Sequence, residues 1–237
     1  MMDAGITIWM PALNEAKRIE KTLTEVYILA KQMLPEFEIL VIDDGSTDDT
    51  YNVVSLLAAR LGSEIKIIKK EKNEGLGEAF KTAVSLAAFP KVTWFPADNA
   101  YLIEGIKNLF TVRNDAAVIL GYRENLSMRP PIRRFLSGMV TRYVRFLIGK
   151  KITDAQGALV LPVDLCRKIT FQFARYNFQM QVLTFILSRE IQYKEIPVLY
   201  SSEADAHSGM LKKKVLWDVI KSAVPLAFLK ITGRLGK

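Results

Sequence analysis

Short apolar runs alternate with longer segments of mixed polarity through the first half of the chain. Runs rich in Ile, Val, Leu and aromatic residues predict strands over residues 6–10, 37–42, 65–68, 92–95 and 117–121. Apolar residues at helical spacing predict helices over residues 15–34, 48 or 49 to 61, 76–88 and 102–112. Because strands and helices alternate, we expect a mostly parallel sheet with helices on both faces.

The pattern changes after Gly121. Arg129-Pro130-Pro131 interrupts the chain, and residues 132–149 then carry apolar side chains at helical spacing, with arginines over much of the remaining surface. Two further strands and a helix are expected in the stretch that ends at Leu199. The segment 211–231 again has helical spacing and several lysines.

Charge is divided unevenly along the chain. Residues 1–119 hold 13 Lys and Arg against 17 Asp and Glu, whereas residues 120–237 hold 20 against 8. A basic half attracts phosphates of a nucleic acid, an anionic lipid or a phosphorylated substrate, and charge alone does not choose among them. We therefore predict one α/β domain followed by a basic amphipathic helix. The domain covers residues 1–210, with halves 1–120 and 121–210, and the helix covers residues 211–237.

Several features predict where the protein resides. The sequence contains no run of 18 apolar residues and no signal peptide before its first strand, and the lone Cys166 fits a reducing compartment. The segment 123–151 has eight basic residues and one acid, Glu124. We expect its helix to lie at a membrane interface on the cytoplasmic face, without a transmembrane helix. The alternative is a core helix with a basic outer face.

Polar residues and glycines follow four of the predicted strands. The segments are Pro11–Glu15, Asp43–Asp48, Asn73–Gly77 and Pro96–Asn99. Ligands of parallel sheets bind beyond the carboxyl ends of the strands. Carboxylates there can accept hydrogen bonds from a base or a ribose, and glycines allow close backbone approach to a ligand. Each segment alone could be a turn with a helix cap, but four together predict a ligand site.

These segments resemble the family 2 glycosyltransferases, in particular the dolichol-phosphate mannose and glucose synthases. The most specific part is Asp43-Asp44-Gly45-Ser46-Thr47-Asp48. The resemblance covers roughly residues 5–215 and implies a GT-A fold, a Rossmann-like sheet flanked by helices. It also implies that a nucleotide sugar is held by Pro11, Asn14, Glu15, Asp43, Asp44, Gly75 and Gly77.

The second half carries matching segments. They are Gly121-Tyr122-Arg123, Arg133 to Ser137, Thr153–Ala158 and Ile196-Pro197-Val198. In the enzymes that the chain resembles, a lipid phosphate attacks the anomeric carbon with inversion, so the phosphate needs positioning rather than a general base. We expect the acceptor phosphate to be bound by Arg123, Arg133 and Ser137, with Arg134 and Lys212 as further candidates. The catalytic candidates are Asp98, Arg123 and Asp154.

The chain departs from the family pattern after its fourth strand. Pro96 stands where the family has the first Asp of Asp-x-Asp, and Ala100 where it often has Gln. Asp98 is left as the metal ligand, so we expect weak binding of Mg²⁺ or Mn²⁺. The segment Ser208–Lys212 matches its family motif only loosely, and Ala158 replaces a Phe.

The predicted function is transfer of one sugar from a GDP-mannose or UDP-glucose type of donor to a polyisoprenyl phosphate. One alternative is a soluble GT-A transferase with a hydroxyl acceptor. Another is a catalytically impaired nucleotide-binding relative whose basic face binds a membrane or a nucleic acid. The sequence shows neither an aromatic single-strand platform nor a recognition helix, so we expect no nucleic-acid partner.

Overall fold

The computed structural model describes residues 5–169, 178–201, 226, 227 and 230. Its strands form a single sheet in the order β3-β2-β1-β4-β6-β5-β7. The strands are β1 (Ile6–Ala12), β2 (Phe37–Asp43), β3 (Ile65–Lys69), β4 (Lys91–Trp94), β5 (Val118–Arg123), β6 (Leu159–Pro162) and β7 (Tyr193–Val198). Every pairing is parallel except those of β6, which runs antiparallel to β4 and β5. The predicted mostly parallel sheet is confirmed.

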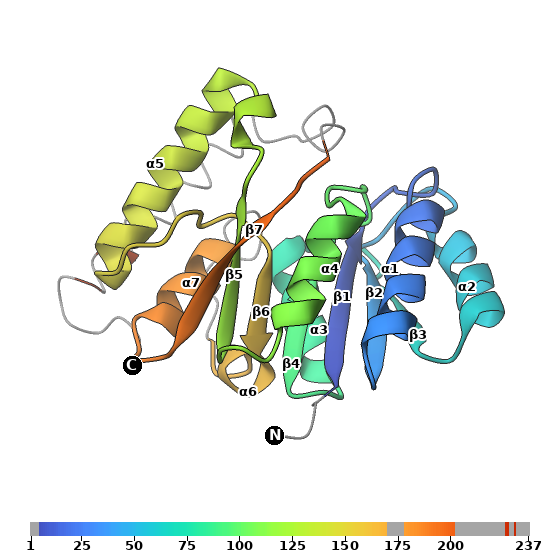
Figure 1. Ribbon diagram of the computed structural model, residues 1–237. Helices are drawn as coiled ribbons and strands as arrows, with labels where there is room; N and C mark the ends of the chain where they lie inside the picture. The colour runs from blue at the N-terminus through green and yellow to red at the C-terminus, as the bar shows by residue number, and fades with distance from the viewer. Residues whose placement is uncertain (1–4, 170–177, 202–225, 228–229, 231–237) are drawn as a thin grey trace.

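Helices cover both faces of this sheet (Figure 1). One face carries α1 (Ile19–Met33), α2 (Thr50–Leu61) and α4 (Ile103–Val112). The other carries α3 (Leu76–Leu86), α6 (Val163–Cys166) and α7 (Phe178–Leu187). The long helix α5 (Pro131–Ile148) packs its last turns against this second layer through Val144, Leu147 and Ile148. Its first turns rise beyond β5 in Figure 1.

Strand side chains alternate between two cores. In β1, Ile6, Ile8 and Met10 face the core under α1, α2 and α4, whereas Trp9 faces the core under α3 and α7. In β2 the segment 39–42 divides in the same way. Because both faces of the sheet are covered, these strands are apolar at nearly every position.

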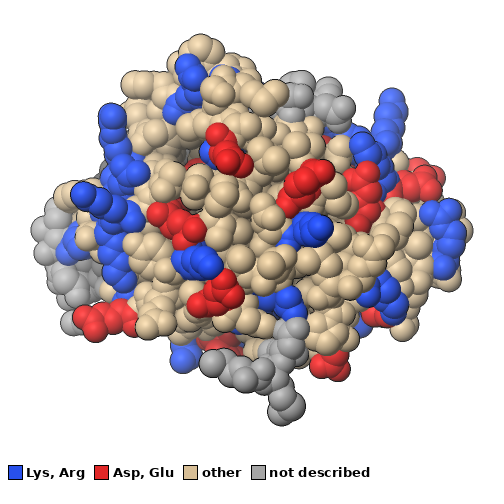
Figure 2. Space-filling view, viewed as in Figure 1, with Lys and Arg blue, Asp and Glu red and all other residues tan. Residues whose placement is uncertain are grey.

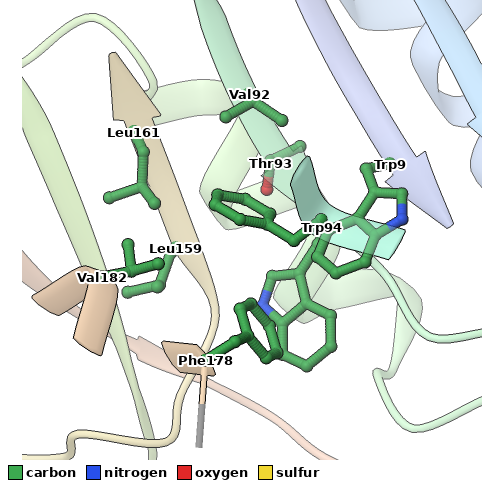
Figure 3. Close-up of a pocket in the computed structure, with 9 residues that line it drawn as sticks. Trp9, Val92, Thr93, Trp94, Leu159, Leu161, Phe178 and Val182 are labelled. Carbon is green, nitrogen blue, oxygen red and sulfur yellow. The ribbon is translucent and has the colours of Figure 1, made fainter. Parts of the chain in front are cut away.

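An aromatic cluster fills the second core. Trp9 stacks on Trp94 with ring centroids 5.5 Å apart, and Phe178 meets the two rings edge-on at 5.6 and 5.4 Å. A small cavity remains between these rings, Phe80 and the strands β4 and β6 (Figure 3). Its lining is almost wholly apolar, so we interpret it as a packing feature of the core.

Two predicted helix boundaries differ from the structure by more than one residue. α1 begins at Ile19 rather than residue 15, because the Glu15 carbonyl accepts hydrogen bonds from the N–H groups of Arg18 and Ile19 in a turn. α3 ends at Leu86 rather than residue 88, since Ala87 leaves the helical conformation. No helix among the described residues is long and apolar enough to cross a membrane. The predicted helix 211–237 lies outside the described residues except at 226, 227 and 230, which are helical.

Candidate active site

The loop after β1 is tied to the loop after β2. Asn14 has a φ of 57°, and its backbone N–H donates to Ser46 Oγ at 2.9 Å. Its side-chain Oδ1 accepts from the Thr47 N–H at 2.9 Å, and the Glu15 N–H donates to Thr50 Oγ1 at 2.9 Å. Asn14 is exposed and its amide oxygen is engaged by the neighbouring loop. Asn14 therefore connects the loop after β1 to the loop after β2.

Asp43 and Asp44 lie at the carboxyl end of β2 and are both buried. The two Asp44 oxygens accept from the backbone N–H groups of Glu74 and Gly75, at 3.0 and 2.8 Å. Asp43 Oδ1 accepts from the Ser46 N–H at 2.8 Å, whereas its Oδ2 accepts no hydrogen bond from the described residues. Asp44 thus holds the loop after β3, and Asp43 keeps one carboxylate oxygen for another donor.

Glycines shape the loop that Asp44 holds. Gly75 has a φ of 97° and caps α3, a conformation that L side chains rarely adopt. Gly77 lies in the first turn of α3 and is buried. Together they bring the backbone of the α3 N-terminus to the same edge as Asp43.

The segment after β4 brings Asp98 to the same edge. The Ala97 N–H donates to the buried Pro11 carbonyl at 3.3 Å, and Thr22 Oγ1 donates to the Ala97 carbonyl at 3.2 Å. Burial raises the pKa of the nearby Glu15 carboxyl, and the negative charge of Asp98 raises it further. Arg18, 2.7 Å from Glu15, acts in the opposite direction. Pro11, Glu15, Asp43, Gly75 and Asp98 therefore lie at the carboxyl ends of the strands on one side of the sheet. We call this the donor edge, after the sugar donor that the sequence predicts there.

The donor edge offers few ligands for a metal ion. Among the described residues no group of three or more His, Cys, Asp or Glu could hold one. Asp98, with Glu15 beside it, is compatible with a hard cation that takes its remaining ligands from water and diphosphate oxygens. The residues therefore fit a weakly held Mg²⁺ or Mn²⁺ and do not form a complete protein site.

The predicted pair Arg123 and Asp154 meets beyond β5. Arg123 Nη1 lies 2.9 Å from Asp154 Oδ2, and Nη2 donates to the Gln156 carbonyl at 2.8 Å. The guanidinium also lies over the Tyr200 ring, 4.7 Å from its centroid. Asp154 accepts a further bond from the Gln156 N–H at 2.8 Å. Arg123 is thus held on two edges and one face.

On α5, the predicted phosphate ligands Arg133 and Ser137 share the inward face and are buried. Ser137 Oγ accepts from Arg129 Nη1 and donates to Gln156 Oε1, both at 2.9 Å. We call Arg123, Arg129, Arg133, Ser137 and Gln156 the acceptor cluster, after the function that the sequence predicts for Arg123, Arg133 and Ser137. Sequence reasoning missed Arg129 and Gln156, because Arg129 stood out only as the residue before two prolines and Gln156 lay inside a longer motif.

Not every predicted acceptor residue joins this cluster. Arg134 is exposed and lies on the outward face of α5. Lys212 lies outside the described residues. The outward face of α5 also exposes Ile132, Phe135, Met139 and Phe146, with relative exposures of 53, 61, 51 and 59%. Lys and Arg gather on the side where α5 lies, whereas both signs of charge mix elsewhere on the face in Figure 2.

Comparison with relatives agrees with this architecture. The chain is 28% identical to "Dolichyl-phosphate beta-glucosyltransferase ALG5C" of Trichomonas vaginalis, over 92% of this chain and 70% of that protein. It is 30% identical to the ALG5A enzyme of the same organism, over 92% of this chain and 73% of that protein.

Solved structures share the fold at low sequence identity. Mannosyl-3-phosphoglycerate synthase from Rubrobacter xylanophilus has a TM-score of 0.73 and 17% identity, over 99% of this chain and 76% of that one. Glucosyl-3-phosphoglycerate synthase from Mycobacterium tuberculosis, in complex with Mn²⁺, UDP and phosphoglyceric acid, has a TM-score of 0.65 and 16% identity, over 93% of this chain and 78% of that one. The expected GT-A fold is confirmed.

The family model for glycosyl transferase family 2 matches residues 7–162, which span β1 to β6 and so include both the donor edge and the acceptor cluster. The chain therefore belongs to glycosyl transferase family 2 and is a glycosyltransferase.

Proposed function

We propose that this glycosyltransferase transfers one sugar from a nucleotide sugar to a polyisoprenyl phosphate at a membrane surface. The observation that carries the proposal is the acceptor cluster. In it, Arg129 and Gln156 contact Ser137, Arg123 contacts the Gln156 carbonyl, and Arg133 shares the buried face of α5 with Ser137. Tyr101, three residues after Asp98, bridges Tyr200, whose ring contacts the Arg123 guanidinium, and this connection supports a site shared by the two groups of residues. The dolichyl-phosphate glucosyltransferases among the relatives support the same acceptor class.

The donor edge binds the nucleotide sugar in this proposal. Asp43 Oδ2 accepts a hydrogen bond from the base or ribose, and Glu15 and the Pro11 segment line the same side. Asp44, Gly75 and Gly77 hold the α3 N-terminus toward the diphosphate. Asn14 contributes to nucleotide binding indirectly, because it holds the loop after β2 in place.

The acceptor cluster binds an anion that is already a nucleophile. A phosphate monoester is ionised near neutral pH, so its oxygen attacks the anomeric carbon without a general base. The new oxygen–carbon bond forms as the bond from that carbon to the diphosphate oxygen breaks, with inversion, and the nucleoside diphosphate leaves. Arginines suit this task because they grip a phosphate through two donors at once. Asp154 keeps Arg123 in place.

A divalent cation has one function in this proposal. Asp98 would hold it, and it would neutralise charge that develops on the leaving diphosphate. The Mn²⁺ in the mycobacterial structure supports cation use in this fold. Mg²⁺ and Mn²⁺ are both compatible with the residues present.

The outward face of α5 provides the membrane contact. Exposed Phe and Met side chains lie beside Arg134 and Arg142 there, a combination that suits the boundary between lipid headgroups and acyl chains. The lipid phosphate then enters the acceptor cluster from the inward side of the same helix. We propose a peripheral position on the cytoplasmic face, with the domain boundary near residue 210 and the basic segment 211–237 as a second contact.

The decisive assay is transfer of radiolabelled sugar into an organic-extractable product. Purified protein is incubated with GDP-mannose or UDP-glucose and polyisoprenyl phosphate in detergent micelles. We expect extractable label that is lost when the lipid lacks its phosphate. If label enters only water-soluble acceptors, the acceptor assignment is wrong and the enzyme uses a hydroxyl or soluble phosphate.

A further inference from the structure

The residues just after β7 connect the donor edge with the acceptor cluster. Tyr200 forms an isolated antiparallel bridge with Tyr101, three residues after Asp98. On the other side, Asn125 Nδ2 donates to the Tyr200 carbonyl at 2.7 Å, and the Tyr200 N–H donates to Asn125 Oδ1 at 3.2 Å. Contacts on both sides therefore fix the backbone of Tyr200.

The Tyr200 ring contacts two side chains. One is Tyr101, whose ring centroid is 4.6 Å away, and the other is the Arg123 guanidinium at 4.7 Å. Tyr101 is buried and also packs against Phe95, 5.4 Å away, so the Tyr200 ring has a rigid support. Burial raises the pKa of Tyr200 to about 12. The ring is therefore neutral in the physiological range and acts on Arg123 through its π face.

We propose that Tyr200 is a positioning residue that orients the Arg123 guanidinium toward the acceptor phosphate. This inference rests on the proposed function and deepens it. Asp154 and the Gln156 carbonyl bind two guanidinium edges, and the Tyr200 ring limits the tilt of its plane. A directional phosphate contact loses strength when a guanidinium tilts, even if its charge stays in the site.

Three substitutions separate the ring from its hydroxyl and from general packing. Tyr200→Phe keeps the π face, whereas Tyr200→Leu removes it and keeps an apolar side chain. Tyr193→Leu is the matched control, because Tyr193 lies at the opposite end of β7. Each variant is assayed with polyisoprenyl phosphate in micelles, and its nucleotide affinity is measured by calorimetry.

We expect Tyr200→Leu to lower kcat/KM for the lipid phosphate by roughly 3- to 30-fold, the range of a partly desolvated cation–π contact. Nucleotide affinity should stay within about twofold of the wild type in all three variants. In Tyr200→Phe and Tyr193→Leu, kcat/KM for the lipid phosphate should also stay within about twofold, a difference worth under 0.5 kcal/mol. In an Arg123→Ala background, Tyr200→Leu should have almost no further effect, because Tyr200 acts through Arg123.

Two outcomes would overturn the inference. One is a folded Tyr200→Leu variant with wild-type lipid-phosphate kinetics. The other is a full additional loss from Tyr200→Leu in the Arg123→Ala background, which would indicate a structural effect independent of Arg123. Neither outcome is confused with failure of the proposed function, because in that case the wild type itself makes no organic-extractable product.

Discussion

At the scale of single residues, the adjacent Asp43 and Asp44 differ in what their carboxylates contact. Asp44 accepts from two backbone N–H groups, so we expect Asp44→Ala to lower the free energy of unfolding by about 1.5–3 kcal/mol and to abolish measurable nucleotide-sugar binding. Asp43→Asn keeps the shape and the Ser46 contact, so it should weaken nucleotide binding with little loss of stability. Denaturant unfolding and calorimetry separate the two effects.

The control for this pair is Asp49→Asn, at an exposed position before α2. It should change neither the free energy of unfolding nor the free energy of nucleotide binding by more than about 0.5 kcal/mol. A folded Asp44→Ala variant with unchanged nucleotide affinity would show that nucleotide binding does not depend on the contacts of Asp44 with the loop after β3.

The surroundings of Glu15 predict that the free energy of unfolding depends on pH. Burial, and secondarily Asp98, raise the pKa of its carboxyl in the folded protein against the effect of Arg18. The folded state therefore binds this proton more readily than the unfolded state does. The resulting stabilisation is present below the unfolded pKa and is lost as pH rises through the folded pKa. Relative to Glu15→Gln, the wild type should be less stable at pH 7 than at pH 4, as measured by urea unfolding. A pH-independent difference would contradict this.

At the scale of elements, α5 has two faces with different predicted functions. We expect Phe135→Ser with Phe146→Ser to weaken binding to anionic lipid vesicles at least tenfold, since each buried Phe contributes about 1.5–3 kcal/mol. Vesicle sedimentation measures this. Leu56→Ser is the matched control, because Leu56 is 72% exposed on α2. Equal binding by the double variant and the control would exclude α5 as the membrane contact.

The inward face of α5 is tested by neighbouring arginines. Arg133→Ala should leave nucleotide affinity intact and weaken use of the lipid phosphate by about 1.5–3 kcal/mol, the value of one charge-assisted contact. Arg134→Ala, one position away on the outward face, should affect vesicle binding more than transfer from micelles. Steady-state kinetics with varied lipid phosphate compares the two. Normal lipid-phosphate kinetics in Arg133→Ala would disprove its assignment.

At the scale of the whole molecule, the proposed metal site needs ligands from both the protein and the nucleotide. With Asp98 as its main carboxylate, activity after chelation should recover only at cation concentrations on the order of millimolar. Asp98→Asn should raise that requirement further. The control is Asp115→Asn, a surface carboxylate paired with Lys194. Full activity in excess chelator would show that the enzyme needs no metal.

Local sequence was sufficient to predict the donor edge. Its residues follow β1, β2, β3 and β4 directly, and parallel strands end at the same side of a sheet. Asp43, Gly75 and Asp98 were therefore predictable as neighbours, although Gly75 and Asp98 lie about 30 and 55 residues after Asp43 in the sequence. What their side chains contact was not predictable, because Asp44 is engaged by backbone groups 30 and 31 positions away.

The apolar pattern of α5 predicted a helix and an amphipathic surface but not which residues face inward. Arg133 and Ser137 are buried, whereas Phe135 and Met139 of the apolar stripe are exposed. A helix alone leaves this choice open, because its orientation is set by the packing of its last turns against α7.

Taken by itself, the sequence determined the alternation of strands and helices, the polar strand ends and the family, because these depend on neighbouring residues and short motifs. Tertiary structure decided the position of β6 between β4 and β5, which brings Gln156 to Arg123 and Ser137. It also decided the contact of Tyr200 with Arg123. These groups lie 19 to 77 residues apart. Such contacts form only when both halves of the chain pack into one sheet, since no local preference encodes which distant side chains will meet.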